Sequence, residues 1–286
     1  MALPPRCARG DNNAEIDLNE HWQLQLYRRS LKKKLTVGAL LEHLPPTAGR
    51  LCLEVGCGTG LTSHFLRQRG GTWVSTDFER DHVRSAKQMV GDRVLQTSDA
   101  ELPFRSASFD MVAAINFLEH IEDDDRFFRE MVRVLKPGGD FLFMAPKGET
   151  GRPGYALKRI LGFTADQEGF GHARDGYPPS AARALFERHG LELSGTDDYC
   201  RIFTESIEDL LNYAYHRKSM QGKDTQQQDF HGDTAPMSAE ALNKVGTAYK
   251  LYSAVYPALR AWTMLDHLIP FSPGYMLVAW GRKKAA

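Results

Sequence analysis

Residues 51–60 read LCLEVGCGTG. The first five are mostly apolar, which is typical of a strand that is buried on both faces. Gly56, Gly58 and Gly60 then follow at alternate positions, before the helical pattern of residues 61–68. Glycines let a backbone approach a ligand closely, and a helix N-terminus presents unpaired N–H groups. A strand, a glycine turn and a helix in this order predict a binding site for a nucleotide-like ligand.

The spacing of the glycines helps to distinguish a dinucleotide-binding turn from a turn that binds a positively charged group. A dinucleotide-binding turn has the pattern G-x-G-x-x-G and places a pyrophosphate at the start of the helix. Here Leu61 occupies the position of the third glycine of that pattern, and Glu54 precedes the turn. A carboxylate at this point would repel a pyrophosphate and attract an ammonium or a sulfonium group. For these ten residues alone, an ordinary strand-to-helix turn without a ligand is the alternative.

Further along the chain, strand-like and helix-like segments alternate. The strand-like segments after the first are residues 72–76, 94–97, 111–115, 141–144, 191–195 and 275–280. Such alternation predicts an α/β fold with a doubly wound, mostly parallel, seven-stranded sheet of the Rossmann-like type. Right-handed crossovers then place the ligand site at the carboxyl ends of the strands.

The last predicted strand is separated from the others by a long segment. We therefore divide the chain into a mobile N-terminal segment with a helical cap, a core, a helical insertion and a final core strand, at residues 1–44, 45–200, 201–272 and 273–286. Within the insertion, residues 238–269 are helical in pattern and apolar on two sides, and Pro257 is expected to kink them. We expect the insertion to pack over the ligand site.

Two more acids follow predicted strands. Asp77 lies about 20 residues beyond the glycine turn, where an acid can accept hydrogen bonds from the ribose hydroxyls of a nucleoside. Asp99 ends the third strand. Each acid could instead be a local helix cap or turn residue. Because parallel strands end at one edge of a sheet, we expect Glu54, Asp77 and Asp99 to line one cavity.

Three further strings accompany the motif EVGCGTG of residues 54–60: DAELPF at 99–104, LEHI at 118–121 and LKPGG at 135–139. Together they resemble the class I methyltransferases that use S-adenosylmethionine, in particular the small-molecule enzymes of the ubiquinone and menaquinone type. The resemblance covers about residues 51–144 and implies S-adenosyl-L-methionine as the cofactor.

The same resemblance implies roles for individual residues. Asp99 and the backbone N–H of Ala100 would contact the adenine ring, and residues 135–139 would form a turn without a ligand. The complete set of cofactor-binding residues that it implies is Glu54, Gly56, Cys57, Gly58, Gly60, Asp77, Phe78, Asp99, Ala100 and Asn116.

Candidates for catalysis and for acceptor binding lie further along the chain. His120 and Glu119 follow the fourth strand, whose end faces the transferred methyl group in this family, and either could be a general base. The alternative is that His120 orients its loop or packs beside the adenosine. Residues 171–177 resemble a substrate-side segment more loosely, and they offer His172, Arg174 and Tyr177 for an acceptor pocket. A surface role for these three residues is the alternative.

Composition narrows the choice of partners. The chain has 36 Lys and Arg against 36 Asp and Glu, so its overall charge does not favour nucleic acid. Four cysteines without a C-x-x-C pair or metal-ligand spacing predict no metal site and a reducing, cytoplasmic setting. No stretch reads as a membrane span or a secretion signal. The oligomeric state is left open.

The predicted function is therefore methyl transfer from S-adenosylmethionine to a small or lipid-like acceptor by in-line displacement. Aromatic and apolar residues in the insertion suggest a lipophilic acceptor or a peripheral membrane contact through residues 201–272, against a dimer interface or additional core. Two other functions stay open: a nicotinamide-dependent oxidoreductase, and a catalytically silent module that binds the adenosyl group. Whether the acceptor atom is oxygen, nitrogen or carbon is left open too.

Overall fold

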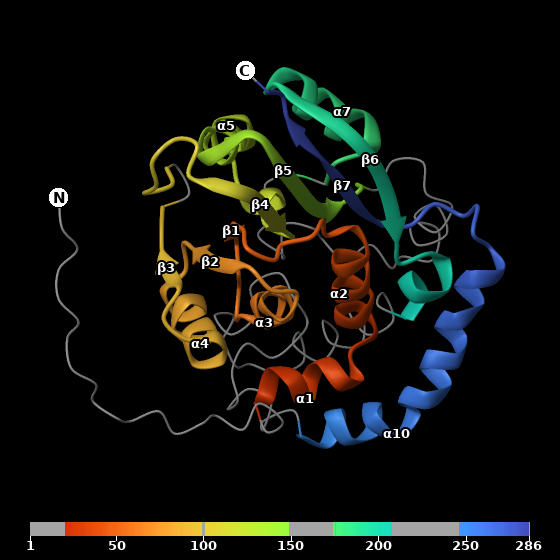
Figure 1. Ribbon diagram of the computed structural model, residues 1–286. Helices are drawn as coiled ribbons and strands as arrows, with labels where there is room; N and C mark the ends of the chain where they lie inside the picture. Colours follow the sequence, from red (N-terminus) through yellow and green to blue (C-terminus); the bar gives the residue numbers. More distant parts are fainter. Residues whose placement is uncertain (1–20, 99–100, 149–173, 175, 208–245, 286) are drawn as a thin grey trace, which may run out of the picture.

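A seven-stranded sheet forms the centre of the molecule (Figure 1). The computed structural model describes residues 21–98, 101–148, 174, 176–207 and 246–285. The strands are β1 (Leu51–Val55), β2 (Thr72–Asp77), β3 (Val94–Gln96), β4 (Phe109–Ile115), β5 (Leu135–Pro146), β6 (Leu191–Tyr199) and β7 (Met276–Lys283). Their order is β3-β2-β1-β4-β5-β7-β6, and β7 alone runs antiparallel to its neighbours. The predicted fold class is confirmed.

Helices cover both faces of this sheet (Figure 1). The described helices include α1 (Trp22–Arg29), α2 (Leu31–His43), α3 (Leu61–Gln68), α4 (Arg80–Val90), α5 (Asp124–Val134) and α7 (Pro179–Arg188). Leu40 of α2 and Leu66 of α3 pack with Trp73 on one face. Phe128 of α5 and Phe186 of α7 pack on the other face. Apolar strands buried between two helical layers are what the continuous hydrophobic runs of the sequence predict.

Side chains at the helix ends explain where two of these helices begin. The Ser30 hydroxyl accepts a hydrogen bond from the Lys33 amide at 3.2 Å, which caps α2. Asp123 accepts one from the Arg126 amide at 2.9 Å and caps α5. Such caps satisfy N–H groups that have no partner inside the helix. Both helices therefore start where local chemistry favours it.

The LKPGG string lies inside a strand, where the sequence predicts a turn. Pairing between β4 and β5 shifts from Phe109↔Leu135 to Met111↔Asp140, so residues 136–139 stand opposite Asp110 alone. Gly138 adopts a φ of 72° within this segment. The local chain reversal expected from proline and glycine is thus absorbed as a bulge, and β5 begins six residues earlier than the predicted residue 141.

The described part of the predicted insertion consists of residues 201–207, helix α10 (Gly246–Thr263) and the 3-10 helix η4 (Met264–Leu268). Helix α10 continues through Pro257, and it bends along its length in Figure 1. The Lys34 ammonium of α2 donates to the Tyr256 hydroxyl at 2.8 Å and ties α10 to the core. The start of the helix predicted at residues 238–269 lies outside the described residues, which resume at residue 246. Packing of the insertion over the ligand site stays a prediction.

In the part of the chain that the structure describes, every helix is too short or too polar to span a lipid bilayer.

Candidate functional site

The glycine turn between β1 and α3 is fixed to the end of β2. The amides of Gly56 and Cys57 both donate to the carbonyl oxygen of Thr76, at 2.8 and 2.9 Å. The amide of Gly58 donates to Oδ2 of Asp77 at 2.8 Å. The turn therefore has its conformation set by the neighbouring strand tip, as a preformed binding site requires.

The three glycines are needed for three different reasons. All have positive φ, at 75°, 50° and 96° for Gly56, Gly58 and Gly60. A Cβ at Gly56 would lie 2.2 Å from the Phe117 ring, and one at Gly60 would lie 2.8 Å from Cα of Ala86 in α4. At Gly58 a Cβ would meet no atom within 4 Å. Gly58 thus presents bare backbone to open space, and this is the position where a ligand can approach closely.

Glu54 is directed into the protein and away from the open side of the turn. Its carboxylate is fully buried, with 0% exposure. Thr62 donates to it at 2.6 Å and Ser75 at 2.7 Å, and Ser63 donates to it as well. The Glu54 carboxylate thereby holds the start of α3 against β2. Its effect on a ligand comes through the shape of the turn, and a direct contact stays a prediction.

Asp77 lies at the end of β2, where the sequence places it, and is 3% exposed. Besides the Gly58 amide, its carboxylate accepts from the Glu79 amide at 2.9 Å and from Nδ1 of His82 at 3.2 Å. A carboxylate offers about four acceptor positions. With three taken by the protein, Asp77 keeps capacity for a hydroxyl donor.

His82 of α4 is the electrostatic partner of Asp77. Burial lowers the pKa of His82, but the hydrogen bond and the negative charge of Asp77 outweigh burial, so that its pKa is raised overall. Its second ring nitrogen, Nε2, is buried without a hydrogen-bond partner. The sequence contains no motif that singles out His82; only its position five residues after Asp77 in an amphipathic helix could have suggested it.

An aromatic and amide cluster follows on the next strand tips. Phe78 is 36% exposed, and its ring centroid lies 5.7 Å from that of Phe117. Asn116 directly after β4 has a φ of 50°, and its Oδ1 is buried without a hydrogen-bond partner. A buried amide oxygen without a donor is costly unless a ligand or water satisfies it. The cluster therefore offers an apolar ring surface and one acceptor beside the glycine turn.

Helix α1 adds a residue that the sequence analysis did not find. Gln23 is 1% exposed, its side-chain amide donates to the Thr59 hydroxyl in the glycine turn, and its Oε1 is buried without a partner. The sequence signal is weak, because Gln23 and Leu26 are merely three residues apart on one buried helix face. The predicted helical cap thus contacts the turn directly.

Two candidate catalytic residues lie on η1 (Leu118–His120), directly after β4. Glu119 is buried, with 2% exposure, and His120 is partly exposed. Their place at the carboxyl end of β4 is as predicted. Their part in proton transfer stays a prediction.

The substrate-side candidates that the structure describes bind the protein itself. Arg174 pairs with Asp124 at 2.5 Å and donates to the carbonyl oxygens of Ile121 and Glu122, both at 2.9 Å. The Tyr177 hydroxyl donates to Asp124 at 2.8 Å, and burial followed by this hydrogen bond raises the pKa of Tyr177. These contacts favour a role in fixing the loop after η1. A contact with the acceptor stays a prediction.

Several predicted residues give no test of the shared cavity. Asp99, Ala100 and His172 lie outside the described residues. The side chain of Cys57 packs in a core cluster with Val83 of α4, and burial raises its pKa, with the charge of Glu54 as the next cause. Any contact of Cys57 with a ligand is therefore limited to its backbone.

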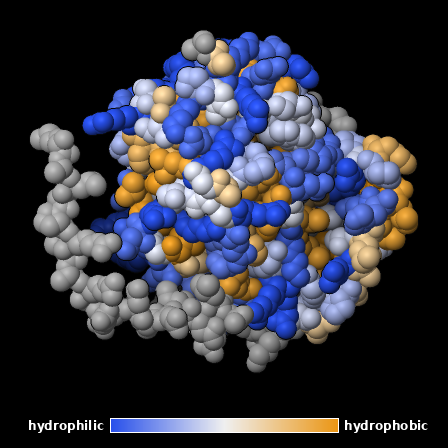
Figure 2. All heavy atoms as spheres, viewed as in Figure 1, coloured by the Kyte–Doolittle hydropathy of each residue, from blue (hydrophilic) through white to orange (hydrophobic). Residues whose placement is uncertain are grey.

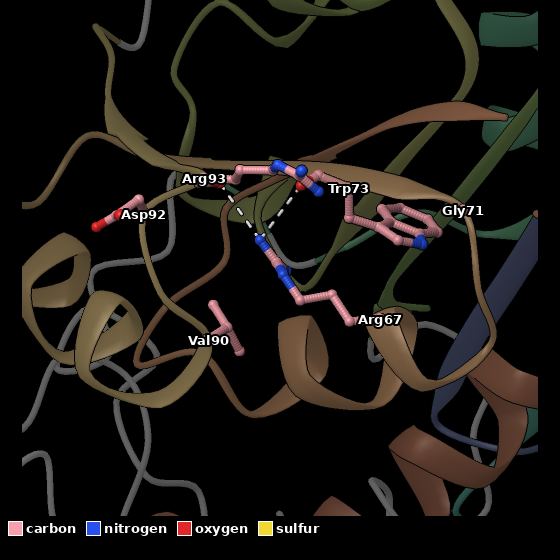
Figure 3. Close-up of a pocket in the computed structure, with 6 residues that line it drawn as sticks. All are labelled: Arg67, Gly71, Trp73, Val90, Asp92 and Arg93. Carbon is pink, nitrogen blue, oxygen red and sulfur yellow. Dashed lines mark hydrogen bonds between the residues drawn. The ribbon is translucent and has the colours of Figure 1, made fainter. Parts of the chain in front are cut away.

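The structure also contains an open pocket of about 450 Å³ at the other ends of the strands. Figure 3 shows its lining side chains, which are Arg67, Gly71, Trp73, Val90, Asp92 and Arg93. Arg67 donates across it to the carbonyl oxygens of Trp73 and Arg93, at 3.4 and 3.3 Å. Because Trp73 lies near the start of β2 and Arg93 precedes β3, this pocket is remote from the glycine turn.

Known proteins share both the motif region and the fold. Residues 53–143, which include the glycine turn, Asp77 and the Asn116 cluster, match the family model described as a methyltransferase domain. Over this segment the chain is similar to S-adenosylmethionine-dependent methyltransferases. The resemblance stated from the sequence is thereby confirmed at this level, while a ubiquinone-type subfamily is not specifically indicated.

Individual relatives of this methyltransferase domain act on different acceptors, according to their names. A 27-O-demethylrifamycin SV methyltransferase from Amycolatopsis mediterranei is 38% identical over 37% of this chain and 44% of its own length. An 18S rRNA (guanine(1575)-N(7))-methyltransferase from Saccharomyces cerevisiae is 30% identical over 39% of this chain and 46% of its own. Of the solved structures, a putative methyltransferase from Bacillus halodurans has 18% identity and a TM-score of 0.54, covering 87% of this chain and 99% of its own.

The chain spans only 39–44% of the length of three of the curated relatives that it matches. The family model matches residues 53–143, which surround the glycine turn. The acceptor-binding parts of those relatives therefore give no direct guide to the acceptor of this chain.

Proposed function

We propose that this protein transfers a methyl group from S-adenosylmethionine to a small, lipophilic acceptor by in-line displacement. The observation that carries the proposal is the bare backbone of Gly58, held beside Asp77 at the carboxyl ends of β1 and β2. It lies within the segment that matches the methyltransferase family. In open α/β sheets, ligands bind at this end of the strands.

The residues around the turn fit an adenosyl amino acid. Asp77 retains an acceptor position for a ribose hydroxyl, and the exposed Phe78 ring offers an apolar surface for the adenine. The orphaned oxygens of Asn116 and Gln23 are acceptors that suit the ammonium group of the amino acid. In each of these contacts the ligand would either donate a hydrogen bond to an available oxygen or cover an exposed aromatic ring.

The chemistry asked of the protein is mainly positioning. When bound, the cofactor supplies an activated methyl group. Alignment of an acceptor at about 3 Å from that group is worth several kcal/mol of the barrier. A hydroxyl acceptor would need its proton removed, for which Glu119 and His120 on η1 are the candidates. An amine or carbon acceptor would leave these two residues with an orienting role.

A lipophilic acceptor is supported by the apolar side chains exposed near the end of α10, including Trp262 and Phe271. Balanced formal charge supports a small acceptor over a nucleic acid, because nucleic-acid binding usually depends on excess positive charge. The names of the relatives include both acceptor classes. The choice therefore depends on the features of this chain.

Calorimetric titration with S-adenosylmethionine and, separately, with NADH tests the cofactor. Saturable 1:1 binding of the first and none of the second is expected. Binding of NADH alone would favour an oxidoreductase and contradict the proposal.

Incubation with methyl-labelled S-adenosylmethionine and fractionated cell extract then tests the reaction. We expect label in an organic-soluble small molecule. Label in RNA or protein would contradict the proposed acceptor. Cofactor binding without any labelled product would favour a silent adenosyl-binding module.

A further inference from the structure

We propose that the protein rests on an anionic lipid surface through an apolar tip formed by the end of α10, η4 and the loop that follows. We define the apolar tip by Trp262, Met264, Leu268 and Phe271, whose exposed fractions are 47, 59, 73 and 85%. Figure 2 shows apolar side chains gathered along the right margin, where Figure 1 places the end of α10. This surface contact goes beyond methyl transfer and does not depend on it.

The apolar side chains are concentrated there. Among the described residues, eight large apolar side chains are exposed, and the four of the apolar tip include the three most exposed ones. Single exposed apolar residues are common on soluble proteins, whereas a contiguous group of large ones marks an interaction surface. Trp, Phe and Leu are the side chains that anchor peripheral proteins in the boundary between headgroups and acyl chains.

The apolar tip is held in place by a buried acid on its inner side. Asp266 of η4 is 8% exposed and accepts from the amides of Phe203 and Thr204, at 2.9 and 3.1 Å, and from the Thr204 hydroxyl at 2.6 Å. Arg201 donates to the carbonyl oxygen of Ser272 at 3.0 Å. These hydrogen bonds hold the apolar tip against residues 201–204, so that its apolar side chains stay exposed in a defined arrangement.

The charges around the apolar tip favour an anionic partner. Between residues 252 and 275 the sole acid is the buried Asp266, whereas Arg260 and His267 are exposed. On the adjoining helix α2, the Lys34 ammonium lies 5.1 Å from the Tyr256 ring centre, and the Lys32 ammonium lies 5.9 Å from that of Tyr275. Cations beside an apolar anchor add attraction to anionic headgroups.

A carboxylate of the sheet, Asp198, is already paired with two other cations. Asp198 of β6 pairs with Lys147 at 2.6 Å and with Arg201 at 3.5 Å. The cations beside the apolar tip, such as Arg260, argue against binding of a second copy of the chain to this surface. A two-fold interface would bring the like charges of the two copies together. A lipid surface with negative headgroups satisfies both the apolar side chains and the cations.

Sedimentation of the full chain with vesicles tests the proposal. We compare phosphatidylcholine vesicles containing 30 mol% phosphatidylserine with pure phosphatidylcholine vesicles, each at low and high salt. The protein is expected to bind the anionic vesicles more tightly, and salt should weaken that binding because it screens surface charge.

Three variants sharpen the test. The double variant Leu268→Ser/Phe271→Ser should lower the partition coefficient on anionic vesicles at least about tenfold. Arg260→Glu should lower it about fivefold on anionic vesicles and hardly at all on neutral ones. Leu95→Ser, at a 41% exposed position on the edge strand β3, is the matched control and should bind as the unmodified protein does. Thermal melting of each variant checks that the fold is intact.

Three results would overturn the proposal. The first is a lack of vesicle binding by the unmodified protein, and the second is equal binding by the double variant. The third is a dimer in solution that the double variant converts to a monomer, which would assign the apolar tip to self-association. Calorimetric titration with S-adenosylmethionine on the same samples keeps this test separate from that of the proposed function. Substitutions in the apolar tip are expected to lower vesicle binding and to leave cofactor binding unchanged.

Discussion

Two regions of this molecule treat their polar groups differently. Around the glycine turn, the protein leaves acceptors and backbone open: nothing lies within 4 Å of a Cβ built on Gly58, and the buried oxygens of Asn116 and Gln23 lack donors. Around residues 174–177, Arg174 and Tyr177 direct their hydrogen bonds to Asp124 and to backbone carbonyl groups. We therefore expect the first region to receive a ligand and the second to stabilise a loop.

A family motif in this fold can therefore mark either a ligand site or a structural contact. Both regions resemble family motifs, and each contains a buried polar atom without a hydrogen-bond partner. At the turn these atoms are the acceptor oxygens of Asn116 and Gln23, near the open backbone of Gly58, whereas in the other region it is the donor Nε of Arg174, whose other nitrogens bond to the protein. Unsatisfied buried polar groups are rare in folded proteins, so acceptors beside open backbone are the stronger indication of a ligand. Substitutions in the two regions should accordingly affect different measurements.

The largest contrast is expected between two glycines of the same turn. Gly56→Ala places a Cβ against the Phe117 ring at a φ of 75°, so we expect a loss of about 3 kcal/mol or more in the free energy of unfolding. Gly58→Ala meets no protein atom and should cost only about 1 kcal/mol from its positive φ, while weakening S-adenosylmethionine binding at least about tenfold.

Chemical denaturation and calorimetric titration distinguish the two glycine variants. If Gly58→Ala binds the cofactor as tightly as the unmodified protein, the open backbone is not the binding surface. If Gly56→Ala is as stable as the unmodified protein, the packing against Phe117 is wrong.

The next largest effect is expected at Asp77. Asp77→Asn keeps the size of the side chain but removes its charge. The Kd for S-adenosylmethionine should rise about 100-fold through the weakened hydrogen bond from a ribose hydroxyl, because a hydrogen bond to a charged group is worth about 1.5–3 kcal/mol. Asp92→Asn, at the remote pocket beyond α4, is the matched control and should leave the Kd unchanged. Equal effects of the two substitutions on the Kd would mean that cofactor binding depends on the overall charge of the protein and not on the position of Asp77 at the end of β2.

A smaller effect on stability alone is expected at Tyr177. Tyr177→Phe removes a buried hydroxyl that donates to Asp124 at 2.8 Å, which should cost about 2 kcal/mol in the free energy of unfolding. The Kd for S-adenosylmethionine should not change, because this residue fixes the loop beside α5. A large rise in acceptor KM at unchanged stability would instead show that Tyr177 lines the acceptor pocket.

The smallest effect is a pH dependence at His82. Because its pKa in the folded protein is raised above the ordinary value, its pair with Asp77 adds stability fully below the ordinary pKa of about 6.5 and loses it as pH rises through the folded value. His82→Gln should therefore cost up to about 1 kcal/mol at pH 5.5 and nearly nothing at pH 8.5. Urea denaturation at both pH values measures this difference, and a constant cost would contradict the assignment.

Much of the fold could be predicted from the sequence, for identifiable reasons. Short apolar runs such as residues 51–55, alternating with helical patterns, indicate a parallel sheet because strands covered by helices on both faces are apolar along their length. The LKPGG string was predicted wrongly as a turn. Residues 136–139 form a bulge opposite Asp110, with Gly138 at positive φ, and this pairing with β4 is not visible in the local sequence. The pairing of β7 between β5 and β6 likewise depends on contacts distant in sequence.

The candidate site could be predicted less completely. The positions of Gly58, Asp77 and Asn116 follow from strand ends, because parallel strands finish at one edge of the sheet. The inward direction of the Glu54 carboxylate does not, since it depends on hydroxyls of α3 and β2. Gln23 was missed because a helix outside the motif region brings it to the turn. Neither the direction of a buried side chain nor a contact between distant segments can be recognised from the local pattern of one sequence.

A crystal structure with S-adenosylhomocysteine would show whether the glycine turn and Asp77 bind the cofactor, through the distances from the ligand to Asp77 and Gly58. We predict that a ribose hydroxyl lies within hydrogen-bond distance of the Asp77 carboxylate and that the ligand is in van der Waals contact with the backbone of Gly58. A ligand bound elsewhere, with Asp77 still contacting only Gly58, Glu79 and His82, would contradict the account.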